Sequence, residues 1–192
     1  PVMVLGDGII GQMMEPVEFP AREPRCPEKP WATTGCKGRK PNVVKSLWLD
    51  PYRLEQHNQE LFRKYDRIRA EEVRVETRGL EEAEVVLCAY GTTSRICRTA
   101  MVELAKQGIK VGLVRPITLF PFPAETIRAL DPRKVRCILT VEMSMGQMVE
   151  DVRLYTEGRI PVHFYGRTGG VVPAPKEIQR EVERLLGKEV QG

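Results

Sequence analysis

Three glycines near the start of the chain have the spacing of a phosphate-binding turn. The string Gly6-Asp-Gly8-Ile-Ile-Gly11 follows the apolar run Val2–Leu5, so it reads as a strand, a glycine turn and a short apolar helix. In a dinucleotide fold, such a turn brings the first amides of a helix to a pyrophosphate. That fold also needs a second parallel strand ending in an acidic residue about 20 residues further on. Here that position falls in a proline-rich basic segment, so the pattern indicates a backbone turn that leads a strand into its helix.

Four short strings of polar residues and glycines follow apolar runs in the second half of the chain. They are Gly91-Thr-Thr-Ser94, Arg115-Pro-Ile-Thr118, Glu142-Met-Ser-Met-Gly-Gln147 and Gly166-Arg-Thr-Gly-Gly170. Ligands of doubly wound sheets bind at the carboxyl ends of the strands, where these strings would lie. The candidate residues for an anion-binding crevice are Thr93, Ser94, Arg115 and Arg167. Alternatively, these loops need glycine and short polar residues for turn geometry alone.

Cysteine and histidine indicate no metal site. The five cysteines, at positions 26, 36, 88, 97 and 137, form no C-x-x-C pair. This argues against a disulfide framework and against a complete zinc or iron–sulfur site. Cys88 and Cys137 lie in apolar runs, where we expect small core residues, and a reducing cytoplasm is the expected location. Neither His57 nor His163 has the spacing of a metal ligand, and no nucleophile has a recognisable base.

The positive charge of the chain is concentrated in one segment. The formal net charge is +4, while residues 20–45 hold seven Lys or Arg against two Glu, a local excess of +5. This segment also holds most of the prolines before position 45, which prevent a regular hydrogen-bonded ladder. It is therefore expected to be a strap or linker. The strap is either solvated or docked on an acidic partner or on phosphates, and with no nucleic-acid motif present we predict no nucleic-acid binding.

Apolar runs alternate with amphipathic segments in the rest of the chain. The expected strands are Val85–Tyr90, Val111–Val114, Cys137–Val141 and Val162–Phe164, and the expected helices are Ser94–Gln107, Ala124–Leu130, Met148–Tyr155 and Lys176–Leu186. Continuous β-branched strands, each followed by a helix, predict a doubly wound α/β fold of three layers with a mostly parallel sheet. A further helix is expected near Arg53–Arg69, with Asp50 as its N-cap and Pro51 at its first position.

The length and the ends of the chain set further limits. With 192 residues the chain is long enough for one α/β domain with extra segments. Its longest apolar runs are too short to span a bilayer, so no membrane association is predicted. It begins at Pro1 within an apolar, strand-like run and shows no secretory signal. We therefore expect a fragment of a longer protein.

Several longer strings resemble one protein family. In chain order they are Pro1–Pro20, Lys29-Pro-Trp-Ala-Thr-Thr-Gly35, Gly91–Arg95, Gly108-Ile-Lys-Val-Gly-Leu-Val-Arg-Pro-Ile-Thr-Leu-Phe-Pro-Phe-Pro123, Val141–Arg153 and Phe164-Tyr-Gly-Arg-Thr-Gly-Gly-Val-Val-Pro173. Together they closely resemble the alpha subunit of 2-oxoacid:ferredoxin oxidoreductases, most like the 3-methyl-2-oxobutanoate type. The resemblance covers essentially the whole chain.

The resemblance implies a division into three parts. Residues 1–18 look like the last strand and helix of domain I, which covers the pyrimidine ring of thiamin diphosphate. Residues 19–75 would be the proline-rich basic strap and a connecting helix. Residues 76–192 look like domain II, similar to the transketolase C-terminal domain, with five strands and usually one antiparallel edge strand. Asp7, Gln12 and Glu15 would then lie at the edge of the active site, unless they are only a polar helix start.

The resemblance also implies that the reactive groups are supplied elsewhere. Gly6-Asp7-Gly8 matches the start of the magnesium thiamin diphosphate motif, but the Asn-Asn pair that completes it is missing, since the only asparagines are Asn42 and Asn58. In the family the beta subunit holds the diphosphate and magnesium, and gamma and ferredoxin-like subunits complete the complex with its iron–sulfur clusters. The fragment alone is expected to bind no cofactor, to be inactive and to serve as a scaffold.

Two other functions remain open from the sequence. One is a stand-alone α/β protein that binds a nucleotide or an anion at the Gly6–Gly11 turn or in the sheet crevice, which a stabilising ligand would reveal. The other is a basic strap that binds RNA, which predicts retention on nucleic acid that falls steeply with salt.

Overall fold

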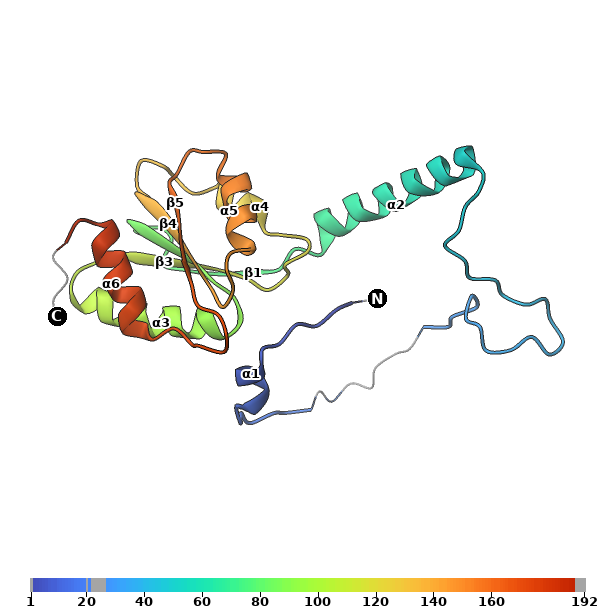
Figure 1. Ribbon diagram of the computed structural model, residues 1–192, viewed down its shortest axis with the longest axis horizontal. Helices are drawn as coiled ribbons and strands as arrows, with labels where there is room; N and C mark the ends of the chain where they lie inside the picture. The colour runs from blue at the N-terminus through green and yellow to red at the C-terminus, as the bar shows by residue number, and fades with distance from the viewer. Residues whose placement is uncertain (1, 20, 22–26, 189–192) are drawn as a thin grey trace. The chain divides into compact units, whose positions relative to one another are not determined.

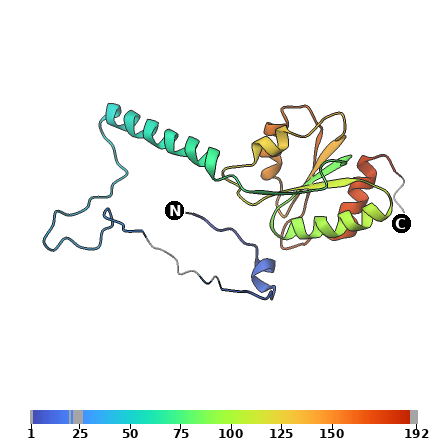
Figure 2. The same cartoon turned by 180° about the vertical axis from the view of Figure 1, so that it is seen from behind.

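The computed structural model describes residues 2–19, 21 and 27–188, and the chain divides into two units (Figures 1 and 2). The first unit, called the sheet unit below, holds Pro1–Met13 and Asp66–Gly192, and the second holds Met14–Tyr65. Each unit is described by itself.

One five-stranded sheet forms the centre of the sheet unit. The strands are β1 (Val75–Arg78), β2 (Val85–Cys88), β3 (Val111–Pro116), β4 (Cys137–Glu142) and β5 (Val162–Gly166). Their order is β1-β3-β2-β4-β5, with β1 antiparallel to β3 and all other pairs parallel. The predicted mostly parallel α/β sheet of five strands is therefore confirmed.

Two helices cover each face of the sheet, which makes three layers (Figure 1). The covering helices are α3 (Gly91–Lys106), α4 (Ala124–Arg128), α5 (Met148–Thr156) and α6 (Pro175–Leu185). Two buried clusters of apolar side chains hold the layers together. One cluster joins α3 and α6 to the sheet, and the other joins α4 and α5 to its opposite face. Burial of apolar side chains on both faces is the main source of stability of such a fold.

The central strands are continuous apolar runs in the sequence because they are buried on both faces of the sheet. All four residues of β2 are buried, and successive side chains point to opposite faces. Val85 and Leu87 join the cluster beneath α3 and α6, while Val86 and Cys88 join the other cluster. A strand buried on both faces needs apolar side chains at every position. The prediction that Cys88 and Cys137 are core residues is confirmed, and burial raises the pKa of both thiols.

The edge strand β1 is an element that sequence patterning did not locate. Its burial pattern is two half-buried residues followed by two exposed ones, as suits a strand at the edge of the sheet. It ends at Gly79, where the backbone turns with φ +60°. Four residues with two charges, Glu76 and Arg78, have neither the length nor the alternation that identifies a strand. Only pairing with β3 places them in the sheet.

The first residues of the chain differ from the prediction. The short helix is present as α1 (Gly8–Gln12), but Val2–Leu5 is not a strand, so that expectation was wrong. Val2 is 92% exposed, and among the described residues no strand pairs with this run. A strand needs a neighbour that satisfies its backbone groups, and an apolar sequence alone does not provide one.

The second unit contains the described part of the strap and most of one long helix, α2 (Pro51–Glu71). The predicted start of α2 is confirmed, since Asp50 Oδ1 accepts hydrogen bonds from the amides of Tyr52 at 3.0 Å and Arg53 at 3.3 Å. Within the strap, the Asn42 amide donates to the carbonyl oxygens of Pro30 and Ala32. Residues 20 and 22–26, including Cys26, lie outside the described residues. No residue of α2 is buried, although the helix carries an apolar stripe.

Candidate functional site

The carboxyl ends of β2 and β4 mark the point where the chain reverses its direction through the sheet. From β2 the chain passes to β3 on one side and then to β4 on the other side. In doubly wound folds, this reversal opens the loops to either side and forms the usual ligand-binding crevice. The two loops here are Ala89–Tyr90, before α3, and Met143–Gln147, before α5.

Glu142 organises the second of these loops. It is the last residue of β4 and is 1% exposed. Its carboxylate accepts hydrogen bonds from four donor groups. The donors are the Ser144 hydroxyl at 3.0 Å and the amides of Gln147 at 3.1 Å, Met148 at 3.1 Å and Val149 at 2.9 Å. The first amides of α5 thus bind an internal carboxylate, which suits the positive end of a helix dipole.

The two loops adjoin each other, because they follow neighbouring parallel strands, β2 and β4. Burial raises the pKa of Tyr90, and the negative charge of Glu142 raises it further. The role of Glu142 could have been predicted from its position in the sequence, although not from the composition of the chain. A single glutamate ends a strand that is apolar except for Thr140, and the next helix begins six residues later, at Met148.

Asp7 lies at the start of α3 as well as at the start of α1. Its Oδ1 accepts hydrogen bonds from the amides of Ile9 at 3.0 Å and Ile10 at 2.8 Å, which makes it the N-cap of α1. Burial raises its pKa, but hydrogen bonds from Ile10, Thr92 and Ile9 outweigh that effect, so the pKa is lowered overall. A Cβ added at Gly91 would lie 3.6 Å from Asp7 Oδ2. The carboxylate of Asp7 therefore occupies the N-terminus of α3, where an external anion would otherwise bind.

We expect Asp7→Ala to detach α1 from α3 without unfolding the sheet. The variant loses the side chain that accepts hydrogen bonds from the amides of Ile9 and Ile10 and caps α1, a cost of about 1 kcal/mol. Hydrogen exchange measured by mass spectrometry should then accelerate at residues 8–13 and stay unchanged in β2 and β4. Asp66→Ala is a matched control, because the partner of Asp66 among the described residues is the exposed Arg69 in the same helix. Unchanged exchange at residues 8–13 would contradict the described role of Asp7.

The predicted crevice residues Thr93 and Ser94 are both buried in the first turn of α3. The Thr93 hydroxyl donates to the Tyr90 carbonyl at 2.7 Å, and the Ser94 hydroxyl donates to the Gly91 carbonyl at 2.7 Å. Both hydroxyls therefore satisfy the local backbone. The helix begins three residues before the predicted start because these hydroxyls complete its first turn.

The structure does not bring Arg115 and Arg167 together with these residues. Arg115 lies on β3 and its Nη1 donates to Glu76 of β1 at 2.8 Å. Arg167 follows β5 and its Nη1 lies 3.3 Å from Glu177 of α6. Strands β2 and β4 stand between β3 and β5, so the expectation of one crevice containing both arginines needs correction. The physical reason is the strand order, which sends β3 and β5 to opposite sides of β2 and β4.

The remaining predicted site residues lie on the exposed side of the N-terminal segment. Gln12 is the last residue of α1 and is exposed. Glu15 is also exposed and belongs to the second unit. Of the three residues expected at the edge of an active site, Asp7 and Gln12 belong to the sheet unit, and Asp7 lies near Gly91 at the start of α3.

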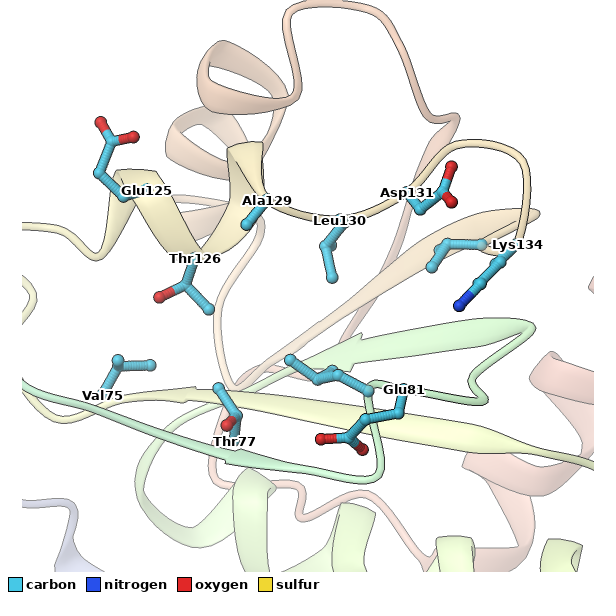
Figure 3. A pocket seen from close by; sticks show the side chains of 11 residues that line it. Val75, Thr77, Glu81, Glu125, Thr126, Ala129, Leu130, Asp131 and Lys134 are labelled. Carbon is cyan, nitrogen blue, oxygen red and sulfur yellow. The ribbon is translucent and has the colours of Figure 1, made fainter.

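An open groove of about 650 Å³ lies between β1 and the region of α4 (Figure 3). It is lined by Val75, Thr77, Leu80, Glu81, Glu125, Thr126, Ala129, Leu130, Asp131, Lys134 and Val135. Two of its carboxylates are already paired, Glu125 with Arg128 at 2.6 Å and Asp131 with Arg133 at 3.1 Å. None of the predicted site residues lines it, so the groove and the predicted site are separate features.

The residues that the structure describes contain neither a metal-ligand cluster nor a membrane-spanning helix. Within residues 2–19, 21 and 27–188, no three or more His, Cys, Asp or Glu side chains are grouped so that they could hold a metal ion. None of the helices in these ranges is long and apolar enough to cross a lipid bilayer.

Similarity to known proteins extends over nearly all of the chain. The ketoisovalerate oxidoreductase subunit VorB of Methanothermobacter marburgensis is 43% identical over 190 residues, which is 98% of this chain and 53% of VorB. The 2-oxoglutarate synthase subunit KorA of Methanothermobacter thermautotrophicus is 28% identical over 96% of this chain and 56% of KorA. The chain thus spans about half the length of the curated relatives that it matches.

A solved structure and a family match agree with these relatives. The 2-oxoglutarate:ferredoxin oxidoreductase from Magnetococcus marinus shares the fold, with a TM-score of 0.63 at 24% identity, over 80% of this chain and 26% of that chain. Residues 83–178, which run from just before β2 to the start of α6, match the pyruvate:ferredoxin oxidoreductase core domain II. The resemblance inferred from the sequence strings is thereby confirmed. The chain belongs to the pyruvate:ferredoxin oxidoreductase core domain II family.

Proposed function

We propose that this chain is part of the alpha subunit of a thiamin diphosphate-dependent 2-oxoacid:ferredoxin oxidoreductase, which converts a 2-oxoacid to its acyl-CoA with ferredoxin as electron acceptor. The observation that carries the proposal is the 43% identity to VorB over 98% of the chain. The preferred substrate is 3-methyl-2-oxobutanoate (ketoisovalerate), because the identity to VorB exceeds the 28% identity to KorA. The complex would work in the cytoplasm.

The proposal gives this chain a scaffolding role. Residues 76–192 form domain II, residues 19–75 form the strap and connecting helix, and residues 1–18 are the end of domain I. Asp7, Gln12 and Glu15 would lie at the edge of the active site, and Asp7 would join domain I to domain II through its contact with the start of α3. The exposed apolar run Val2–Leu5 is consistent with a surface that other residues of domain I cover.

The cofactor chemistry would be supplied by other polypeptides. As the family resemblance implies, we assign magnesium and the diphosphate to the beta subunit, and the iron–sulfur clusters to other parts of the complex with gamma and ferredoxin-like subunits. This chain would contribute contacts between subunits and the rigid placement of domain I.

A chimeric subunit tests the proposal. The half of VorB that matches this chain would be replaced by it, and the chimera would be assembled with the remaining subunits of that enzyme. We expect turnover of 3-methyl-2-oxobutanoate, measured as ferredoxin reduction that depends on coenzyme A, at a higher kcat/KM than for 2-oxoglutarate. The chain alone, given the same substrates and thiamin diphosphate, should show none.

Two results would contradict this function. One is turnover by the isolated chain, which would mean that the reactive groups lie within it. The other is an assembled chimera that is inactive with both oxoacids while unmodified VorB is active in parallel.

A further inference from the structure

Three arginines converge on one glutamate at the outer edge of the sheet. Glu76 of β1 accepts a hydrogen bond from Arg78 Nε at 2.8 Å through its Oε1. Its Oε2 accepts from Arg98 Nη2 at 2.7 Å and from Arg115 Nη1 at 2.8 Å. We call Glu76, Arg78, Arg98 and Arg115 the arginine cluster. Its members come from β1, α3 and β3, so only the folded chain assembles it.

The arginine cluster lies on the face of the sheet that α3 covers. Glu76 is paired in register with Arg115, and Arg78 with Leu113. Leu113 packs in the cluster beneath α3, and residues two apart on a strand share a face, so Arg115 points to the same side. Arg115 is next to the last residue of β3, which places the arginine cluster near the carboxyl edge of the sheet, where α/β folds bind ligands.

Charge within the arginine cluster is unbalanced. Hydrogen bonds from Arg78 and Arg115, aided by the charge of Arg98, lower the pKa of Glu76 to about 2, so its carboxylate is ionised at neutral pH. Three guanidinium groups against one carboxylate leave an excess of two positive charges. Because all three contact the same carboxylate, they lie close enough to repel one another. An additional anion would relieve that repulsion.

Hydrogen-bond donors are also in excess. Each guanidinium carries five N–H donors. The Nε atoms of Arg98 and Arg115 are shielded from solvent, and within the described part of the chain neither has an acceptor. Buried donors without acceptors are uncommon and costly in folded proteins. The side chains of Arg98 and Arg115 as a whole remain 31% and 36% exposed, so part of each arginine is open to solvent.

We propose that Arg78, Arg98 and Arg115 form a binding site for the doubly charged phosphate group of a small ligand. A phosphate monoester carries nearly two negative charges at pH 7 and three acceptor oxygens, which matches the excess of two charges and several free donors. A single carboxylate would neutralise only half of that excess. Planar guanidinium groups also bind phosphate through paired, parallel hydrogen bonds. This site is distinct from the crevice predicted from the sequence, since of those residues it contains only Arg115.

Titration of the 192-residue chain with inorganic phosphate tests the proposal. The readout is the set of arginine Nε–H resonances in ¹H–¹⁵N NMR spectra, with isothermal titration calorimetry in parallel and sodium chloride holding the ionic strength constant. We expect saturable binding with a single site and shifts at Arg98 and Arg115. Succinate measured in the same way should bind more weakly than phosphate.

Matched variants separate a binding site from a structural ion-pair cluster. Arg98→Gln and Arg115→Gln should each weaken phosphate binding by about tenfold, from the loss of one charge-assisted hydrogen bond. Arg133→Gln removes the same charge from an exposed arginine outside the cluster and should leave binding unchanged. Glu76→Gln keeps every arginine and raises the charge excess, so it should tighten binding by about fivefold.

The site assignment is overturned if phosphate produces no more response than chloride at equal ionic strength. It is also overturned if Arg133→Gln weakens binding as much as Arg98→Gln, because the effect would then come from net charge. Should both cluster arginine variants fail to fold, Glu76→Gln decides alone, and unchanged or weaker binding by that variant refutes the site. These measurements involve no turnover, so their outcome is independent of the oxidoreductase assay.

Discussion

Replacing Glu142 by alanine is expected to lower the free energy of unfolding by about 3 kcal/mol. The substitution removes the acceptor of the Ser144 hydroxyl and of the amides of Gln147, Met148 and Val149. Because Glu142 is 1% exposed, water does not readily replace the carboxylate, and the amides at the start of α5 lose their partner. The midpoint of thermal unfolding, followed by circular dichroism, should fall by about 10 to 20 °C.

Glu150→Ala is the matched control for this variant. Glu150 lies in the first turn of α5, as does Met148, but its side chain is exposed. Its replacement loses only a favourable interaction with the helix dipole, about 0.5 kcal/mol. If Glu142→Ala unfolds within a few degrees of Glu150→Ala, then the carboxylate of Glu142 does not hold the loop together.

Gly166→Ala is the second substitution for which we expect a large effect, a loss of about 2 to 3 kcal/mol in the free energy of unfolding. An added Cβ at the end of β5 would overlap the backbone oxygen of Ser144 and the ring of Phe164. Gly166 has no positive φ, so the glycine is required by space and not by backbone conformation. The Phe164 ring can rotate away, but the Ser144 oxygen belongs to the loop that Glu142 fixes, which leaves little room for relaxation.

Gly11→Ala provides the comparison for Gly166→Ala. No atom lies within 4 Å of an added Cβ at Gly11, and this residue is in α1. Alanine favours a helix over glycine by up to about 1 kcal/mol, so the control should be neutral or slightly stabilising. Urea unfolding curves of the two variants measure the difference. Equal midpoints would mean that the close approach of β5 to the Met143–Gln147 loop is not maintained in solution.

Local patterns in the sequence predict much of this fold because each depends on neighbours in the chain. The buried strand Val85–Cys88 reads as an unbroken apolar run, and α2 starts where Asp50 and Pro51 predict it. The family resemblance likewise rests on contiguous strings. Patterns failed where an element depends on a partner elsewhere. Val2–Leu5 has the composition of a strand but no neighbour among the described residues, and β1 has a neighbour but no strand-like composition.

The candidate sites show the same division between local and distant determinants. The sequence alone established the α/β class, the positions of the polar loops and the lack of cysteine and histidine spacing for a metal site. Only the tertiary structure separated Arg115 from Arg167, placed Asp7 against α3 and gathered Arg98 and Arg115 around Glu76. The physical reason is that the order of strands in the sheet decides which charged groups meet, and that order follows from how the two apolar faces are covered by helices. The sequence around a charged residue therefore does not predict which residue, dozens of positions away, will pair with it.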